Sequence, residues 1–507
     1  MKSRSGYKIY LFGAAVVIVA LTAYFLHRSF YLYGQRLTAS ADVLQQGHDL
    51  AQRHCGGCHL VPVPAAHSPR IWNHVLVQMG FRLGHDTFDM HGYFPEDQTG
   101  LRAERDLLIR NPGKPQLSKE DLRTIRNYYL VRSPSEFQPP EKNDSVALRD
   151  AKIVPLRVLH GGPFAVTAAL SQTGGELWLG EGVSKRLFRF DATGASRYES
   201  ALPDMPVSLQ SERNRLQIGF IGSMFPSDDK KGKVMEYVVS PAGLAEGRVL
   251  ASGLYRTAQA TVHPNGEVDA AGFGNTQGEF SVINARGEKQ TIYQGSGAIW
   301  SRRVSLFGTK PQLLVLVAQE KEELILFEKN GNQWQRAETL IKLTPESGTM
   351  QFHVADMNGD GRQDIVLISG DDGDLPGESP RAYHGVRIFF QDAHHKFSER
   401  YFFNFPGAYR GCVADFNRDG ISDIAAASYY PAPNTPHFAL LILLGQKDSG
   451  YKPYRIDTEA AARFITLDCT DADGNGRPDL LLGKGDLKGP EKKGEATTIG
   501  YFIPNPF

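Results

Sequence analysis

The sequence has little cysteine and no excess of either charge. It holds 4 cysteines in 507 residues, which is too few for a scaffold held together by disulfides. Its 56 Lys and Arg residues balance its 56 Asp and Glu residues, so it lacks the net positive charge with which nucleic-acid-binding proteins attract phosphates. These two absences exclude a small disulfide-rich fold and lead us to expect no nucleic acid among the partners.

Long hydrophobic runs are also scarce, which excludes a protein with several membrane spans. The exception is residues 9–26, a run without charge that would extend roughly 27 Å as a helix, close to the thickness of the bilayer's hydrocarbon core. Lys2, Arg4 and Lys8 precede this run, and the positive-inside bias then keeps the short N-terminus in the cytoplasm. We expect residues 1–35 to be an uncleaved signal anchor, a transmembrane helix that exports the rest of the chain. A cleavable signal peptide is the alternative.

Two of the cysteines belong to the pentapeptide Cys55-Gly56-Gly57-Cys58-His59. In a C-x-x-C-H motif both thiols can form thioether bonds to the haem vinyl groups, and the adjacent histidine is an axial ligand of the iron. A zinc half-site is the alternative, but no second Cys/His pair follows at zinc-finger spacing. The motif predicts one covalent haem c, attached at Cys55 and Cys58, with His59 as the proximal iron ligand.

Helices are expected on both sides of this motif. Residues 41–54 carry apolar side chains at helical spacing and lead directly into it. Residues 117–131 show a similar stripe and begin with Ser118 and Asp121, a pair typical of a helix capping box. This arrangement resembles a single-haem cytochrome c domain, in which the first and last helices cross beside the haem. The resemblance implies a small all-α cytochrome c domain over residues 40–135.

The distal iron ligand is less constrained, because either a thioether or an imidazole can fill that position. The segment after the motif offers six candidates, namely Met79, Met90, His67, His74, His85 and His91. We favour Met79 because it shares a helical face with Trp72 and Leu76. This stretch is similar to the "Trp, then Met-Gly" segment of cytochromes fused to repeat propellers. Met90 is the main alternative ligand, and Met79 would then be an ordinary core methionine.

A repeated loop pattern follows a linker, rich in Pro, Ser and charge, over residues 136–156. Asp or Asn occupies loop positions 1, 3, 5 and 9, and glycine occupies position 6, which is the spacing of hard oxygen ligands that calcium prefers. Asx-turns without a metal are the alternative. The predicted calcium ligands are Asp356, Asn358, Asp360, Asp364, Asp415, Asn417, Asp419, Asp423, Asp471, Asp473, Asn475 and Asp479.

Each loop runs into a short apolar strand and lacks the Glu at position 12 of an EF-hand. The repeats resemble the FG-GAP or VCBS repeats of β-propellers, in which such loops join two strands of a blade. Similar strand-like segments occur at residues 176–182, 216–222 and 312–319. The resemblance implies an all-β, seven-bladed propeller over residues 157–507 that binds up to three Ca²⁺ ions.

Three residues before the first aspartate of each loop lie His353, Cys412 and Asp468. Pseudo-symmetry places these residues at equivalent positions near the propeller axis, either in a small polar or metal site or merely satisfied beside a central channel. Cys469 is one residue out of step with Cys412. Because strand side chains alternate between two faces, we expect no disulfide between these cysteines.

The whole chain resembles exported proteins that join a haem c domain to FG-GAP or VCBS repeats. The resemblance implies a single-pass protein of the bacterial inner membrane, with both folded domains in the periplasm. It would transfer single electrons to or from a redox partner protein or respiratory complex docked on the propeller. No catalytic constellation is visible, so we expect an electron-transfer protein more than a self-contained enzyme.

Two other functions remain open. A fused propeller dehydrogenase, with a quinone cofactor, would pass electrons from a small substrate to its own haem. Quinoprotein propellers are typically rich in tryptophan, whereas this one has Trp178, Trp300 and Trp334. A haem with an open coordination position would instead suit a peroxidase or gas sensor, and requires that neither Met79 nor Met90 binds the iron.

Overall fold

The structure is a computed structural model that divides into a helical unit and a β-sheet unit. It describes residues 39–57, 59–85, 114–134, 144–170, 175–212, 214–225, 227–240, 243–319, 321–371, 382–432, 435, 438–448, 450–458, 463–486 and 495–507. The expected anchor over residues 1–35 lies outside these ranges. Within them, no helix is both long enough and apolar enough to cross a membrane.

The helical unit forms where the sequence predicts helices. Its elements are α2 (Ala41–Cys55), η1 (Pro64–Ala66), α3 (Pro69–Arg82) and α5 (Lys119–Arg132). Ser40 caps α2, and the predicted cap of α5 is present, because the Asp121 backbone N–H donates to Ser118 Oγ at 3.0 Å. The Ser118 hydroxyl in turn donates to the Asp121 carboxylate at 2.8 Å.

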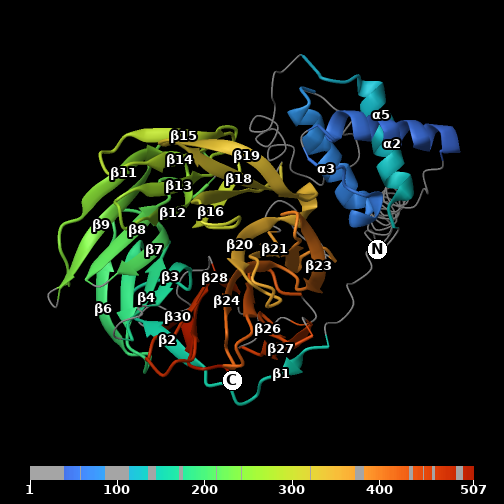
Figure 1. Ribbon diagram of the computed structural model, residues 1–507. Helices are drawn as coiled ribbons and strands as arrows, with labels where there is room; N and C mark the ends of the chain where they lie inside the picture. Colours follow the sequence, from blue (N-terminus) through green and yellow to red (C-terminus); the bar gives the residue numbers. More distant parts are fainter. Residues whose placement is uncertain are drawn as a thin grey trace, which may run out of the picture. The chain divides into compact units, whose positions relative to one another are not determined.

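Helices α2 and α5 cross closely at Gly47 (Figure 1). A Cβ atom at Gly47 would lie 2.6 Å from Tyr128 Cβ and 2.7 Å from the carbonyl oxygen of Thr124. No side chain fits in this space, so the crossing depends on glycine. Leu50 of α2 and Ile125 of α5 are buried and form part of the apolar core of the unit.

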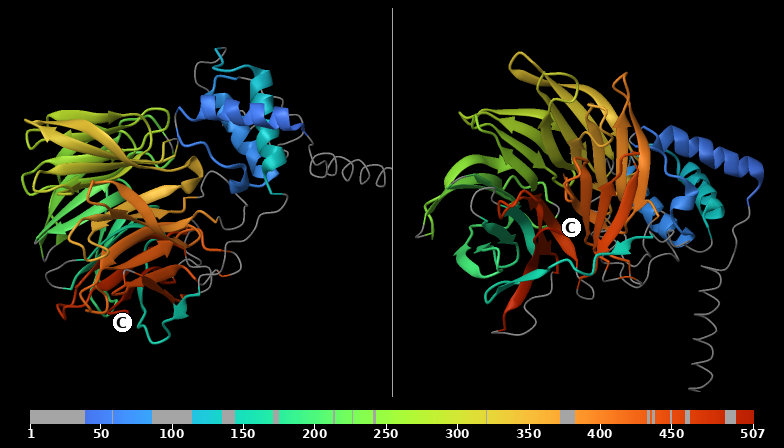
Figure 2. Two further views of the ribbon diagram at one scale, coloured as in Figure 1. Left: turned by 45° about the vertical axis from the view of Figure 1, so that its right-hand side comes forward. Right: turned by 60° about the horizontal axis from the view of Figure 1, so that its bottom comes forward.

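Seven sheets form the blades of a β-propeller (Figure 1, Figure 2), as the sequence predicts. We number the blades in chain order. Blade 1 comprises β3 (Ala165–Leu170), β4 (Leu177–Glu181), β5 (Arg186–Phe190) and β6 (Ser196–Ala201). Blade 2 comprises β7 (Pro206–Glu212), β8 (Arg215–Phe220), β9 (Gly232–Ser240), β10 (Gly243–Leu244) and β11 (Arg248–Leu254). Blade 3 comprises β12 (Thr257–Val262), β13 (Val268–Gly272), β14 (Glu279–Ile283) and β15 (Lys289–Gln294).

The remaining four blades include two strands from the start of the β unit. Blade 4 comprises β16 (Ala298–Val304), β17 (Gln312–Val317), β18 (Glu323–Asn330) and β19 (Gln333–Lys342), and is followed by η2 (Pro345–Ser347). Blade 5 comprises β20 (Thr349–Ala355), β21 (Asp364–Ser369), β22 (Gly385–Gln391) and β23 (Phe397–Asn404). Blade 6 comprises β24 (Ala408–Ala414), β25 (Asp423–Ser428), β26 (Leu440–Gly445), β27 (Tyr451–Ile456) and β1 (Val146–Ala147). Blade 7 comprises β28 (Phe464–Thr470), β29 (Asp479–Lys484), β30 (Thr497–Ile503) and β2 (Val154–Val158).

The ring is closed by strand β2, which precedes blade 1 in the chain but completes blade 7. It pairs antiparallel with β30, with Val154 opposite Phe502, so the two ends of the propeller sequence share one sheet. Strand β1 adds to blade 6 by parallel pairing with β27. Strand β1 and the first residues of β2 therefore fall in the stretch expected to be a linker.

The blades share one register at the innermost strands β3, β7, β12, β16, β20, β24 and β28. In each of them a bulge follows the first residue pair with the second strand. Residues at the same place in these seven strands can therefore be compared directly. The second strands are apolar and buried along most of their length, as in β17 and β21, because neighbouring blades cover both of their faces.

Candidate functional site

The C-x-x-C-H motif begins at the C-terminal end of α2. Cys55 is the last residue of that helix and Gly56 caps it, whereas Cys58 lies outside the described residues. The Nδ1 atom of His59 lies 2.7 Å from the Leu60 carbonyl oxygen. A carbonyl only accepts hydrogen bonds, so Nδ1 carries the hydrogen and Nε2 of the neutral ring carries the lone pair. This tautomer is the one in which Nε2 can ligate iron, and the bond to Leu60 would orient the ring.

The chain that follows the motif is fixed by side chains of two helices. The Tyr129 hydroxyl of α5 donates to the Pro62 carbonyl at 2.9 Å, and Trp72 Nε1 of α3 donates to the Pro64 carbonyl at 2.8 Å. The rings of Trp72 and Tyr129 have centroids 4.2 Å apart, and both side chains are almost fully buried. The helices therefore set the path of the segment that carries His67, whose ring packs edge-on against Trp72.

The candidate distal ligands lie in different surroundings. Met79 is half-buried in α3, on the helical face that also carries the buried Trp72 and Leu76. His74 Nε2 lies 3.0 Å from the side-chain nitrogen of Gln78 on the same helix. His85 is buried just after α3. Met90 and His91 lie outside the described residues, so Met79 stays a prediction.

The three acidic loops join the first and second strands of blades 5, 6 and 7. The aspartate at position 1 of each loop accepts hydrogen bonds from the backbone of its own loop. In blade 5, Asp356 accepts from the N–H groups of Gly359 at 2.7 Å and Gly361 at 2.8 Å. Asp415 and Asp471 accept from the equivalent position-6 N–H groups at 2.8 Å and 2.7 Å. These bonds give the three loops one conformation.

The aspartate at position 9 of each loop is fully buried and begins the second strand. Asp364 accepts from the backbone N–H groups of Met357 and Gln391, both at 2.9 Å, and so ties the loop to the end of β22. Burial, and to a lesser degree the neighbouring carboxylates of Asp360 and Asp356, raise the pKa of Asp364 to about 6, although its two backbone hydrogen bonds act in the opposite direction. The equivalent Asp423 and Asp479 are held in the same way and also have raised pKa values, about 6 for Asp423.

The third loop comes closest to a formed cation site. Oxygens of Asp471, Asp473 and Asp479 lie within 4.8 Å of one another, and no other three His, Cys, Asp or Glu side chains in the described ranges do so. In the first loop, Arg362 instead forms an ion pair with Asp360. The structure thus brings the predicted carboxylates together in the third loop and supplies the first loop with a counter-charge from the chain.

The three loops also contact one another, which the sequence pattern does not reveal. The Ser422 hydroxyl of the second loop donates to the Asp356 carbonyl of the first at 3.1 Å. Arg418 of the second loop donates to the Gly476 carbonyl of the third at 2.9 Å and also reaches the Asn475 carbonyl. The loops therefore form a continuous chain across three neighbouring blades.

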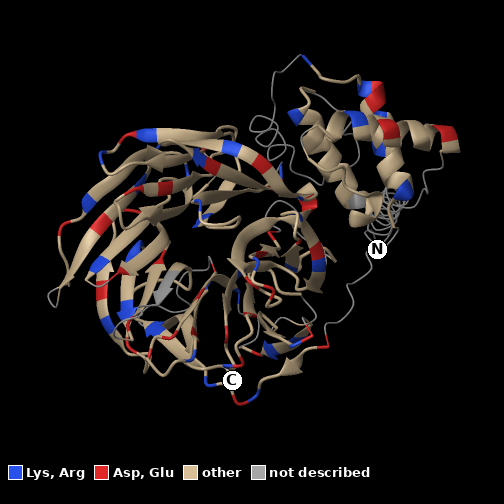
Figure 3. Ribbon diagram, in the orientation of Figure 1, with Lys and Arg blue, Asp and Glu red and all other residues tan. Residues whose placement is uncertain are grey.

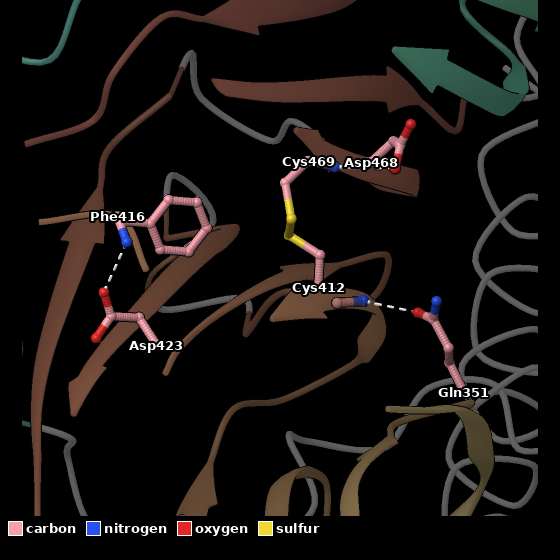
Figure 4. The surroundings of a disulfide bond; sticks show 7 residues. Gln351, Cys412, Phe416, Asp423, Asp468 and Cys469 are labelled. Atoms are coloured by element: carbon pink, nitrogen blue, oxygen red, sulfur yellow. Dashed lines mark hydrogen bonds between the residues drawn. A yellow bond between two sulfur atoms is a disulfide. The ribbon is translucent and has the colours of Figure 1, made fainter. Parts of the chain in front are cut away.

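Cys412 and Cys469 form a disulfide, so the prediction that they would not is wrong (Figure 4). Their Cα atoms are 6.2 Å apart, within the usual range for such a bond. The two residues do point to opposite faces of their own blades, as the alternation rule requires. However, where two adjacent blades pack together, the first blade contributes one face of its sheet and the second blade contributes the other face. Side chains on opposite faces of equivalent sheets therefore point towards each other, and the alternation brings the two thiols together. The bond also removes the Cys412 thiol from any metal site with His353 and Asp468.

Hydrogen bonds also join other innermost strands to the innermost strand of the next blade, as the disulfide does. Gln210 of β7 accepts from the Val262 N–H of β12 at 2.7 Å. This bond joins the fifth residue of one innermost strand to the sixth residue of the next, which are the two positions that the disulfide links. Gln351 of β20 accepts from the Gly411 N–H of β24 at 2.8 Å (Figure 4). The disulfide is therefore the covalent form of a contact that recurs around the propeller.

The comparisons with known proteins assign neither a family nor an activity to this chain. No protein-family model matches the chain, and no curated protein matches its sequence. A chain of Kuenenia stuttgartiensis hydrazine synthase is 14% identical with a TM-score of 0.45, over 67% of this chain and 98% of that chain. Virginiamycin B lyase from Staphylococcus aureus is 12% identical with a TM-score of 0.45, over 70% of this chain and 100% of that chain. At such low similarity these proteins tell nothing about the activity of this chain.

Proposed function

We propose that the chain is an exported, membrane-tethered c-type cytochrome that transfers single electrons and uses its propeller to dock a redox partner. The observation that carries the proposal is the C-x-x-C-H motif, with the Nδ1 hydrogen of His59 directed to the Leu60 carbonyl. When bound, the haem would supply a reversible one-electron change between ferric and ferrous iron. Cys55 and Cys58 would anchor it, and His59 Nε2 and Met79 would ligate the iron.

Covalent attachment is tested by acid-acetone extraction of the full chain, produced in a host that matures c-type cytochromes. We expect the colour to stay with the protein, and the Cys58→Ala variant to lose stable holoprotein. The matched control is the double variant Cys412→Ala/Cys469→Ala, which removes two thiols elsewhere and should keep its haem. Colour that passes into the extract of the wild-type chain would contradict the proposal.

The distal ligand is tested by two methionine variants. A sulfur-to-iron bond gives a weak ferric absorption near the red edge of the visible, which Met79→Ala should remove and Met90→Ala should keep. The reverse result would assign Met90. If the wild-type ferrous protein binds carbon monoxide readily, the iron has an open position and the peroxidase or sensor function replaces electron transfer.

For the propeller we propose calcium binding at the three acidic loops, in the manner of FG-GAP or VCBS repeats. Each loop gathers three aspartates, and the charge of the carboxylate at position 9 is disfavoured first by burial and then by its acidic neighbours. A divalent cation would relieve this repulsion. The stiffened loops would then give blades 5 to 7 a rigid surface for a partner protein. Acidic and basic residues are interspersed along the blades (Figure 3).

The disulfide supports export, because such bonds persist in oxidising compartments. Thiol labelling of intact cells and of the membrane fraction tests this point. We expect the chain to be found with the membranes and Cys412 to react with alkylating reagents only after reduction and denaturation. A chain found in the cytosol with a reactive Cys412 would contradict both the export and the tether.

A further inference from the structure

Two arginines and a histidine from three consecutive blades lie on the innermost strands of the propeller. Arg302 is the fifth residue of β16 and His353 is the fifth residue of β20, so they occupy equivalent places in blades 4 and 5. Arg410 is the third residue of β24 in blade 6. Its guanidinium reaches back past blade 5, because its centre lies 5.2 Å from the centre of the Trp300 ring in blade 4.

The charges of these two arginines are not neutralised by ion pairs. In the described part of the chain, neither Arg302 nor Arg410 forms an ion pair with a carboxylate, although Asp371 acts on Arg410 from a greater distance. Arg303, which follows Arg302 in β16, shows the contrast. Arg303 donates to both carboxylate oxygens of Asp269, at 2.9 Å and 2.7 Å.

His353 lies between these two positive charges. Its Nε2 atom is buried and has no hydrogen-bond partner among the described residues. Burial, and then the nearby guanidinium groups of Arg302 and Arg410, lower the pKa of His353 to about 3, so the ring is neutral at physiological pH. The group therefore has two positive charges, a buried polar atom without a hydrogen-bond partner among the described residues, and an acid, Asp371, that acts on Arg410. Arg302 is exposed, so a dissolved ion can approach from its side, whereas Arg410 is half-buried.

We propose that Arg302, His353 and Arg410 form a binding site for a small oxyanion, a molecule with a phosphate or carboxylate group. A guanidinium group offers two parallel N–H donors that match the oxygens of such an anion. Because Nδ1 of the neutral His353 ring is bonded to the Gly411 backbone, its Nε2 carries the lone pair and contributes a third contact where the anion has a hydroxyl, as hydrogen phosphate does. One ligand would then contact three blades at once. The site is independent of the haem motif and of the acidic loops.

The test is isothermal titration of the full chain with inorganic phosphate and, separately, with succinate, at fixed ionic strength in chloride buffer. Saturable binding of at least one of the two supports the site, and the preferred probe shows whether it takes a phosphate or a dicarboxylate. Each of Arg302→Gln and Arg410→Gln should weaken binding by about tenfold or more. The control is Arg336→Gln, which removes an arginine from the outer strand β19, where it pairs with Glu323, and should bind like the wild type.

Two results would overturn the proposal. One is a wild-type chain that binds neither anion at millimolar concentration, and the other is binding that survives unchanged in both glutamine variants. If a glutamine variant does not fold, Arg302→Lys takes its place. It keeps the charge but loses the planar pair of donors, so weaker binding with unchanged melting temperature supports the site, and unchanged binding overturns it.

Discussion

Blades 5 to 7 and blades 1 to 4 have the same backbone plan but different chemistry in their loops. All seven innermost strands carry the same bulge and the same pairing with the second strand. Only blades 5 to 7 connect these two strands by loops with three aspartates each. The propeller geometry therefore does not require the acidic loops.

Gln312 of blade 4 shows what the fold needs at the start of a second strand. It pairs with the last residue of its innermost strand, as Asp364 does in blade 5. Its side-chain oxygen accepts from the backbone N–H groups of Leu306 and Phe307, both at 3.0 Å. A neutral amide thus holds the loop as well as a carboxylate does. The negative charge in blades 5 to 7 calls for another explanation, and a bound cation is the one we propose.

Among single bonds and single sites, the disulfide of blades 6 and 7 should make the largest difference between the two regions. It closes a loop with a sequence separation of 57 residues, for which chain entropy gives roughly 4 kcal/mol. The variant Cys412→Ala/Cys469→Ala should lower the free energy of unfolding by that order. The control Gln210→Ala, at the equivalent contact between blades 2 and 3, should cost about 1 kcal/mol. Denaturant unfolding followed by circular dichroism measures both free energies of unfolding. If the two variants lose the same free energy of unfolding, the disulfide does not distinguish blades 6 and 7 from blades 2 and 3.

Calcium removal should come next. At about 100 times Kd, calcium binding would stabilise the propeller by roughly 2.7 kcal/mol per site, so a chelator should lower its melting temperature. Hydrogen exchange should quicken in blades 5 to 7 and stay unchanged in blades 1 to 4. The haem spectrum should not change, because none of the predicted calcium ligands lies in the helical unit. Melting that is indifferent to both chelator and added calcium would reduce the loops to ordinary turns.

A third prediction concerns Glu322, at the border between the two regions. This fully buried carboxyl of blade 4 accepts from the Thr349 N–H of blade 5 at 3.1 Å and from the Gln319 N–H at 2.8 Å. Burial raises its pKa from 4.5 to about 8. The folded chain therefore holds this proton more tightly than the unfolded chain, so the contribution to stability is complete below about pH 4.5 and is lost as the pH rises towards 8.

The loss should be on the order of 1–3 kcal/mol, and Glu322→Gln should remove it. Unfolding free energies of both proteins at several pH values between 5 and 8 provide the measurement. If the unfolding free energy falls with pH at the same rate in the wild type and the variant, Glu322 is ionised throughout and other groups cause the pH dependence.

The sequence predicted those features that depend on neighbouring residues in the chain. The spacing of aspartates and glycines located the three loops and the strands after them, and the Ser118–Asp121 pair located the start of α5. Contacts between distant segments were missed, because alternation within one strand does not tell which blades face each other. The disulfide, the closure of blade 7 by β2 and the approach of Arg410 to Trp300 all belong to this class.

The smallest effect is expected at Asp191, an aspartate turn of blade 1 without acidic neighbours in its loop. Its carboxylate accepts from the Thr193 hydroxyl at 2.6 Å and from Arg197 Nε at 2.6 Å. The Thr193 bond, with lesser help from Arg197, lowers the pKa of Asp191 to about 2, so its contribution is present above about pH 4 and is lost as the pH falls towards 2. Because the group is near the surface, solvent screening should keep the cost of Asp191→Asn at neutral pH below about 1 kcal/mol.

That cost should be the same with and without calcium, whereas the cost of Asp471→Asn, at position 1 of the third loop, should grow when calcium is added. The two variants make the same chemical change in an aspartate turn, one in each region of the propeller. Melting temperatures of wild type and both variants, in chelator and in calcium, separate turn formation from cation binding. If Asp471→Asn is as indifferent to calcium as Asp191→Asn, the aspartates of blades 5 to 7 act only through backbone hydrogen bonds.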